Sequence, residues 1–343
     1  MPKSFTYSDE WEAGDFRNGF KLVIRKPYLH IISSCSDTPV LYDYLVEKQG
    51  RSIKNEKRTH IRLWETLKED FFFKHYLYPG LPRIRTIGIM PKAKREYLTL
   101  RYLEHQNIPC IKAAGWGVRW DRVGGVKSCF IITAMAKDTI DLRFWLVKTS
   151  AEAHFEESVA LILKKLGNYF RHLHSNKFFL LRPNTRNILI HELDLCKPRV
   201  LFLDQPYARF LSGPLANWGQ LKDLSTVLGG FFRHIDQSAI DLFFKTYLPD
   251  PLGKYSEDLR QRLIYFIRTR DKRGWFSKFT SYSNALVTYS FDKKQRDDSV
   301  ALWIKKSSTI TTARMEPETT QKNSRRNGPN VLVTGMKTEL HEN

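Results

Sequence analysis

A lysine and a glutamate whose surroundings predict a buried ion pair are the first residues in this chain that could do chemistry. Lys74 lies in the aromatic, strand-like segment 71–76. Glu96 lies on the same face of a predicted helix as Leu100 and Leu103, one stripe of apolar positions. A carboxylate on an apolar face is costly unless it meets a cation. We therefore expect Lys74 to reach Glu96; the alternative is that each is a solvated surface charge.

Two further polar residues stand beside short apolar segments. Asn187 precedes Ile-Leu-Ile at 188–190, and Asp204 ends the strand-like segment 199–203. One amide and one carboxylate, completed by phosphate oxygens and water, form a ligand set that suits Mg²⁺. The alternative is structural, with Asn187 at a strand-start turn and Asp204 as a turn cap.

The segment 173–190 resembles the catalytic loop of a kinase, with one important change. The kinase pattern is His-Arg-Asp-x-x-x-x-Asn followed by an apolar strand. Aligned on Asn187, that pattern places Arg182 where the aspartate base would stand. A guanidinium is permanently charged and cannot take a proton. Either the chain transfers phosphate without this base, with Arg182 binding a phosphate group, or it does no chemistry.

The elements that must position these residues follow from hydrophobic periodicity and turn signals. A helix is expected at 92–106, and a Gly-Gly hairpin signal at 124–125 joins the last two strands before the chain turns helical. The five expected strands of the first half are 40–46, 60–64, 71–76, 113–121 and 126–136. Later elements are helices at 141–147, 156–175 and within 215–290, and short strands at 187–191 and 199–203.

This order predicts an α+β, bilobal protein-kinase-like fold. Its N-lobe would be a five-stranded antiparallel sheet with one helix, and its C-lobe would be mainly helical. The expected division is an N-terminal extension at 1–40, the N-lobe at 41–136, the C-lobe at 137–303 and a disordered tail at 304–343, where large apolar residues are few.

The motifs are similar to those of the lipopolysaccharide kinases, the Kdo and heptose kinase family, over about residues 41–290. The resemblance implies that Lys74 holds the α and β phosphates of ATP with Glu96 as its partner. It also implies that Asn187 and Asp204 hold Mg²⁺. The residues Gln-Pro that follow Asp204 replace Phe-Gly, a tolerable departure.

Three further positions belong to this resemblance. Asp223 would brace the catalytic loop through its backbone, although alone it would be a helix cap. His174 would close the long C-lobe helix, although alone it would be a satisfied structural histidine. Gly50 is the single glycine in the expected nucleotide-binding loop between the first two strands, where a close backbone cradle for phosphates prefers several.

Composition sets the outer limits. The 343 residues, 42% of them hydrophobic, suffice for two lobes with a sizeable core. The formal charge of +20 predicts attraction to polyanions. No CxxC pair occurs among the four cysteines, so neither a zinc site nor a disulfide framework is indicated; they are Cys35, Cys110, Cys129 and Cys196. No apolar run is long enough to span a bilayer, so we expect a cytoplasmic protein, peripheral at the inner face of the inner membrane.

Two functions are therefore carried forward. The leading one is an ATP-dependent, Mg²⁺-dependent phosphotransferase that acts on a sugar hydroxyl of an acidic Kdo or heptose glycolipid at an anionic membrane surface. The alternative is a pseudokinase, a nucleotide-binding or scaffold protein, which Arg182 favours. Nucleic acid is not expected as a partner, because the aromatic residues stand mostly at core positions and only the charge speaks for it.

Overall fold

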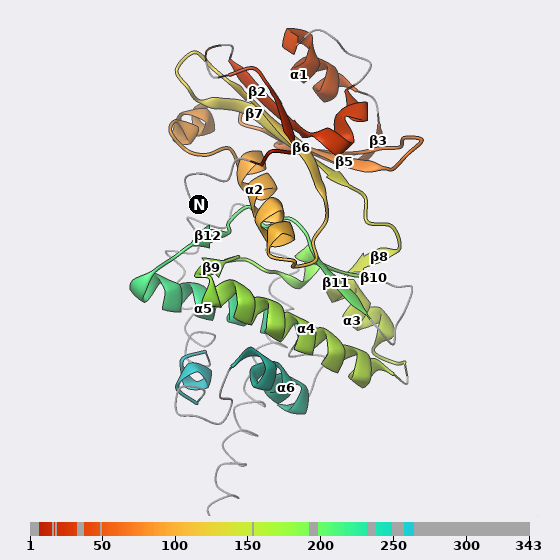
Figure 1. The fold of residues 1–343 in the computed structure, drawn as a ribbon, viewed down its shortest axis with the longest axis vertical. Coiled ribbons are helices and arrows are strands. Elements are labelled where there is room, and N and C mark those ends of the chain that lie inside the picture. The colour runs from red at the N-terminus through yellow and green to blue at the C-terminus, as the bar shows by residue number, and fades with distance from the viewer. Residues whose placement is uncertain are drawn as a thin grey trace, which may run out of the picture.

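A seven-stranded antiparallel sheet and a group of long helices make up the two lobes of this chain (Figure 1). The computed structural model describes residues 7–15, 17, 19–32, 38–48, 50–152, 154–191, 198–231, 237–248 and 257–263. The predicted tail at 304–343 lies outside these residues, as do Cys35 and Cys196. No helix among the described residues has both the length and the apolar character needed to cross a bilayer.

The N-lobe sheet has seven strands, so the predicted count of five was wrong. Two of the additional strands come from the segment taken as an N-terminal extension, whose mixed polarity hid their period. Across the sheet the strands are β1 (Glu10–Ala13), β2 (Phe20–Arg25), β6 (Ala113–Trp120), β7 (Val126–Ala134), β5 (Phe71–Leu77), β4 (Thr59–Trp64) and β3 (Arg51–Glu56).

The predicted strand at 40–46 is a helix, α1 (Thr38–Glu47). Leu41, Tyr42 and Leu45 are buried there at helical spacing, which a short apolar run does not distinguish from a strand. The strand that does occur nearby, β3, was missed because every one of its side chains is exposed. An edge strand in an exposed hairpin has no apolar alternation to reveal it.

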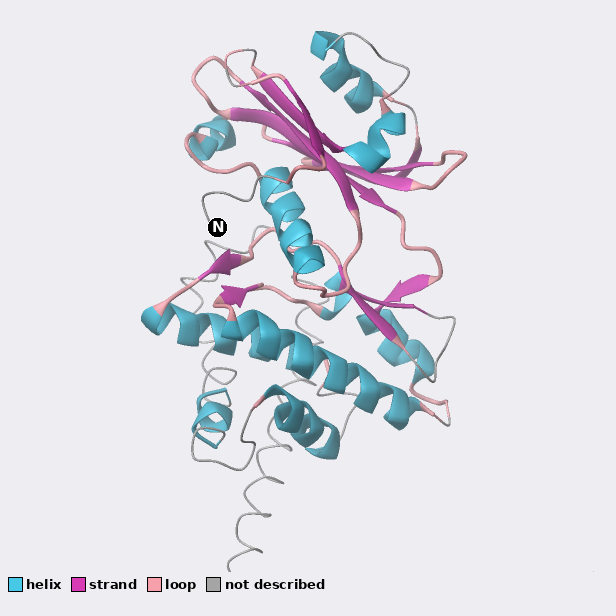
Figure 2. Ribbon diagram, in the orientation of Figure 1, coloured by secondary structure: helices cyan, strands magenta, loops and turns pink. Residues whose placement is uncertain are grey.

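Helices cover both faces of the central part of the sheet (Figure 2). Helix α2 (Lys92–His105), close to its predicted bounds, lies on one face, and α1 with the 3₁₀ helix η1 (Lys26–Ile31) lies on the other. Strand β5 alternates between them: Phe71 and Phe73 pack into the cluster that contains Tyr42, whereas Tyr76 belongs to the cluster of α2. Because side chains alternate along a strand, Lys74 shares the α2 face with Tyr76.

The C-lobe is mainly helical, as predicted. Its long helix α4 is amphipathic and buries Val159, Ile162, Leu166, Phe170 and Leu173 along one face. The elements are β8 (Thr139–Asp141), α3 (Leu142–Thr149), α4 (Phe155–Ser175), β9 (Phe178–Phe179), the 3₁₀ helix η3 (Thr185–Asn187), β10 (Ile188–His191), β11 (Arg199–Phe202), β12 (Arg209–Phe210), α5 (Gly213–Leu228) and α6 (Gln237–Tyr247). Within the predicted helical segment 215–290, description ends at residue 263.

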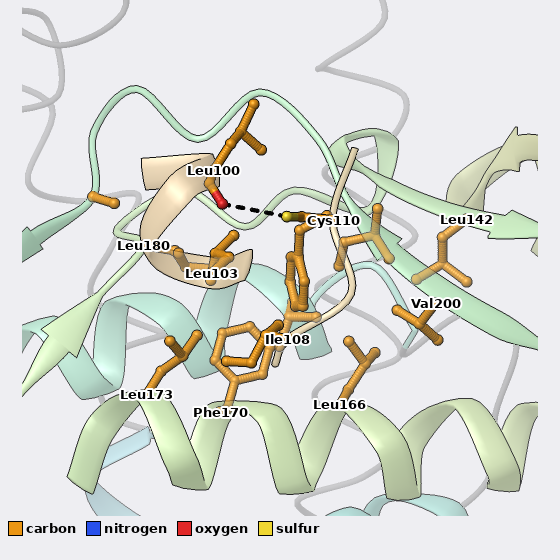
Figure 3. Close-up of a cluster of buried hydrophobic side chains, with 14 of the residues drawn as sticks. Leu100, Leu103, Ile108, Cys110, Leu142, Leu166, Phe170, Leu173, Leu180 and Val200 are labelled. Atoms are coloured by element: carbon orange, nitrogen blue, oxygen red, sulfur yellow. Dashed lines mark hydrogen bonds between the residues drawn. The ribbon is translucent and has the colours of Figure 1, made fainter. Parts of the chain in front are cut away.

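A continuous hydrophobic core joins the lobes (Figure 3). Leu100 and Leu103 of α2 pack in one cluster with Phe170 and Leu173 of α4. Cys110, just after α2, donates its thiol hydrogen bond to the carbonyl of Leu100 at 3.4 Å. The helix that carries Glu96 is therefore packed on the lobe that carries Asp204.

The connection after α2 is also tied to strand β11 by backbone hydrogen bonds. The amide of Ile111 donates to the carbonyl of Phe202 at 3.1 Å, and the amide of Phe202 donates to the carbonyl of Pro109 at 3.0 Å. Asp204 lies just beyond Phe202. The fold thus fixes the end of α2 and the carboxylate of the C-lobe relative to one another.

Candidate functional site

Lys74 contacts carboxylates from both lobes. It lies on β5, which pairs with β4 on one side and β7 on the other. Its Nζ is 3.4 Å from Glu96 Oε1 and 2.8 Å from Asp204 Oδ2. Burial lowers the pKa of Lys74, but the negative charges of Asp204 and Glu96 outweigh it and hold the pKa above its usual value. The ammonium group is therefore a permanent cation at the junction of the lobes.

Glu96 is the most buried member of this cluster, with 2% of its side chain exposed. Tyr76 Oη donates a hydrogen bond to Glu96 Oε2 at 2.7 Å. Burial and the neighbouring charge of Asp204 raise the pKa of Glu96 to about 7, against the opposing pull of Lys74. The predicted Lys74–Glu96 contact is present, and it is the longer of the two contacts that Lys74 makes.

Asp204 lies at the end of β11 with a positive φ of 50°, a conformation that aspartate tolerates better than most residues. Burial raises the pKa of Asp204, but the positive charges of Lys74 and Lys92 outweigh it and hold the pKa below its usual value. Its Oδ2 faces Lys74, and its Oδ1 is buried with no hydrogen-bond partner among the described residues. A buried carboxylate oxygen without a partner is costly unless a ligand satisfies it.

Asn187 lies beside Asp204. Its side-chain Nδ2 donates to the backbone carbonyl of Asp204 at 3.1 Å. The backbone carbonyl of Asn187 accepts from the amide of Leu203 at 2.9 Å. The first contact uses the NH₂ group of the amide and leaves its oxygen for another role. The two residues predicted to hold a metal ion therefore lie in contact, and their ligand role stays a prediction.

These residues fit a magnesium ion that takes most of its ligands from a phosphate group and water. No group of three or more His, Cys, Asp or Glu side chains suited to a metal occurs in the described part of the chain. Mg²⁺ usually needs only one or two carboxylates when phosphate oxygens complete its octahedron. The unpartnered Oδ1 of Asp204 is the atom that would accept such an ion.

Asp223 holds the loop that contains Arg182 through hydrogen bonds to its backbone. This aspartate is fully buried on α5 and accepts hydrogen bonds from the amides of Leu180 at 2.8 Å and Leu181 at 2.5 Å. His174 Nε2 lies 3.1 Å from Asp223 Oδ2, and His174 Nδ1 lies 2.7 Å from Tyr247 Oη. Burial raises the pKa of Asp223, with His174 opposing. The chain fixes Leu181 at a positive φ of 64°, directly before Arg182.

Arg182 stacks on an aromatic ring. Its guanidinium carbon lies 4.5 Å from the centroid of the Tyr207 ring. Tyr207 follows Asp204 by three positions in the sequence Asp-Gln-Pro-Tyr, so the replaced base position and the Asp204 segment are in contact. Stacking on the tyrosine face holds the guanidinium plane of Arg182 in one orientation.

Gly50 does not lie where the sequence pattern put it. The turn between β3 and β4 is formed by Lys57 and Arg58, and Gly50 precedes β3. A Cβ atom on Gly50 would lie 2.6 Å from Trp64 Cδ1. Close packing against Trp64 therefore explains why a glycine stands at position 50. The β3–β4 turn, which corresponds to the phosphate-binding loop of kinases, contains no glycine.

Two residues at the site were missed from the sequence, although periodicity could have found both. Tyr76 is two positions after Lys74 on a strand, so it shares its face. Lys92 is one helical turn before Glu96, and its Nζ lies 4.3 Å from the centroid of the Tyr76 ring. Tyr207 gave no such signal, because its contact with Arg182 depends on how two loops pack.

A strand lysine paired with a helix glutamate, facing an aspartate from a second lobe across a braced loop, is how kinases hold ATP and its metal ions. Fold and site define a protein of the kinase-like class. Residues 57–210 match the model of the "Lipopolysaccharide kinase (Kdo/WaaP) family". The recognition made from the motifs is confirmed: this segment of the chain is similar to that family.

Comparison with solved structures agrees with the fold. The chain matches "WaaP in complex with acyl carrier protein" with a TM-score of 0.58 and 15% sequence identity. The match covers 74% of this chain and 98% of the other. At this identity the likeness establishes the fold alone. No curated protein sequence matches the chain.

Proposed function

We propose that this protein is an ATP-dependent phosphotransferase that moves the γ-phosphate of ATP to a sugar hydroxyl of an acidic glycolipid, such as a Kdo or heptose residue of a lipopolysaccharide core. The observation that carries the proposal is the contact of Lys74 with both Glu96 and Asp204. Together with the family match over residues 57–210, it supports nucleotide binding at these residues.

Each residue has a task in this proposal. Lys74 binds the α and β phosphates, and Glu96 with Tyr76 holds its ammonium group in place. Asn187 and Asp204 hold Mg²⁺ through one amide and one carboxylate oxygen. The ion, when bound, neutralises and orients the phosphates. Asp223 fixes the loop that the acceptor must approach.

Arg182 sets the chemistry apart from that of a kinase with an aspartate base. Phosphoryl transfer passes through a loose transition state, so positioning and electrostatics supply most of the acceleration. The missing base costs roughly 10²- to 10⁴-fold. Stacked on Tyr207, Arg182 binds negative charge of the acceptor or of the transferred group. The family match favours this enzyme over a pseudokinase.

A basic surface suits the proposed acceptor. The formal charge is +20, and each Lys or Arg near an anionic bilayer adds ~1 kcal/mol of attraction. We propose peripheral contact with such a membrane. The similarity to a structure of WaaP bound to acyl carrier protein makes that carrier the first protein partner to test by co-purification.

Titration calorimetry of the purified chain with ATP, with and without Mg²⁺, is the direct test. Binding that strengthens with Mg²⁺ supports the proposal, and transfer of labelled phosphate to a Kdo or heptose lipid then identifies the acceptor. Binding of ATP without any transfer would instead favour the pseudokinase. No binding of ATP under either condition would overturn the nucleotide site.

A further inference from the structure

A second lysine stands over the same aromatic ring as Lys74. The Nζ of Lys92 lies 4.3 Å from the centroid of the Tyr76 ring, and the Nζ of Lys74 lies 5.3 Å from it. Lys92 begins α2, one turn before Glu96. Tyr76 is itself fixed by its hydrogen bond to Glu96 at 2.7 Å. One strand residue thus arranges two ammonium groups around a single ring.

The two lysines differ in what they already bind. Lys74 contacts two carboxylates. Lys92 forms no ion pair with any carboxylate of the described residues, although its positive charge acts on both Glu96 and Asp204. Stacking on tyrosine holds an ammonium group in place while its N–H donors remain available. The ammonium group of Lys92 is therefore held beside Lys74, and its N–H groups can donate hydrogen bonds to an anion.

The β3–β4 turn gives this cation a task. Kinases cover the ATP phosphates with a glycine-rich loop whose backbone amides approach closely. The corresponding turn here is Lys57-Arg58, without glycine. Without glycine, the backbone amides of this turn cannot approach the phosphates of a nucleotide at Lys74 as closely as those of a glycine-rich loop do.

We propose that Lys92 is a second phosphate-binding lysine, seated on Tyr76, and that it takes over part of the role of the missing glycine-rich loop. The inference rests on the proposed binding of a nucleoside triphosphate and names a further residue of that site. Its ligand is the polyphosphate chain, so Lys92 acts on ATP and ADP and has no contact with the nucleoside.

The test compares Lys92→Gln with Lys94→Gln, a matched control. Lys94 lies two positions along the same helix, and its Nζ stacks on a different ring, that of Trp116, at 5.3 Å. Both variants remove one positive charge from α2. Calorimetric titration with Mg-ATP, Mg-ADP and adenosine gives the dissociation constants, and thermal unfolding shows whether each variant is folded.

We expect Lys92→Gln to weaken ATP binding by about tenfold or more, as for a lost hydrogen bond to a charged group. Adenosine binding should be unchanged, Lys94→Gln should bind ATP within about twofold of the unaltered chain, and Lys92→Arg should restore most of the affinity. Tyr76→Leu should lose at least as much affinity as Lys92→Gln, because it removes the ring beneath both lysines.

Three results would overturn the inference, and they have different meanings. Equal ATP affinities for Lys92→Gln and Lys94→Gln, with the unaltered chain binding ATP, would reject Lys92 alone and leave the proposed function standing. Failure of the unaltered chain to bind ATP would reject both. A loss of adenosine binding in Lys92→Gln would mean that the substitution acts through the fold of the cleft and not through the phosphates.

Discussion

The ammonium group of Lys74 lies closer to Asp204 Oδ2, at 2.8 Å, than to Glu96 Oε1, at 3.4 Å. The preferred partner of the strand lysine is therefore the carboxylate that would hold the metal ion. A cation bound at Asp204 competes with Lys74 for its negative charge, which favours the contact of Lys74 with Glu96 and with phosphate. Metal and nucleotide binding should be coupled through this exchange of partners.

The first prediction concerns Asp204→Asn. The amide keeps the shape of the side chain but removes the charge that attracts both Mg²⁺ and Lys74. We expect ATP binding to become independent of Mg²⁺, measured by calorimetry with and without the ion. If Mg²⁺ still strengthens binding to the same extent in this variant, Asp204 is not the ligand. Asp241 lies on α6, and its carboxylate pairs with Arg260. Asp241→Asn is therefore a control for the loss of one negative charge.

The second prediction concerns stability against pH. Burial and Asp204 raise the pKa of Glu96 from 4.5 to about 7, so between these values the folded state binds more protons than the unfolded state. The free energy of unfolding should therefore fall as pH rises from about 4.5 to 7. The contribution of Asp204 has the opposite sign and lies lower, because its pKa is held below 3.8.

Glu96→Gln isolates this effect, because glutamine resembles the protonated carboxyl and does not titrate. Urea unfolding at several pH values should show the variant gaining stability relative to the unaltered chain as pH rises towards 7, with no further change above it. Parallel pH dependences for the two chains would contradict the assignment to Glu96.

The third prediction concerns the brace beneath the catalytic loop. Asp223→Asn replaces one of two acceptor oxygens with an NH₂ group that cannot accept from the amides of Leu180 and Leu181. A buried amide left without its acceptor costs about 1–3 kcal/mol, which denaturant unfolding should detect. Hydrogen exchange at those two amides should speed up at the same time. Unchanged protection there would show that Asp223 does not hold the loop.

The fourth prediction concerns the N-terminal strand and α2. Asp9 accepts hydrogen bonds from Arg101 on α2 at 2.7 and 3.1 Å, and from Arg25 at 3.1 Å. Only 8% of the Arg101 side chain is exposed, so Asp9→Asn leaves a nearly buried cation with a weaker partner. We expect a loss of about 1–3 kcal/mol in the free energy of unfolding.

Glu12→Gln is the matched control for that variant. Glu12 pairs with Lys21 on the neighbouring strand, but half of its side chain is exposed. Exposed pairs contribute about 0–1 kcal/mol. A control that costs as much as Asp9→Asn would mean that any charge lost near the N-terminal strand matters, and that the contact with Arg101 does not.

The sequence predicted what depends on local period and spacing. Helix α2 and the face carrying Glu96 followed from apolar positions one turn apart, and Lys74 followed from its place within an aromatic strand. The contact between Lys74 and Asp204 could not be predicted in that way. It depends on how Leu100 and Leu103 pack against α4, a relation between segments far apart in the chain.

Errors arose where local signals were ambiguous or absent. The apolar run around Leu41 suits a strand as well as a helix, and α1 forms because its buried side chains meet the cluster that contains Phe73 and Phe130. Strand β1 is stabilised by pairing with β2, and β2 also pairs with β6, so their own side-chain pattern was a weak signal. The stacking of Arg182 on Tyr207 likewise depends on tertiary packing.

The backbone hydrogen bonds between the α2–β6 connection and β11 restrict how far the two lobes can move apart. Two lobes joined only by a flexible linker can rotate apart about that linker. Here the end of α2 is fastened to β11, so we expect Glu96 and Asp204 to keep their spacing when nucleotide binds. Strand β3 lies at the edge of the sheet, and all of its side chains are exposed. We expect nucleotide to enter and leave by displacement of the β3–β4 hairpin, with the lobes remaining together.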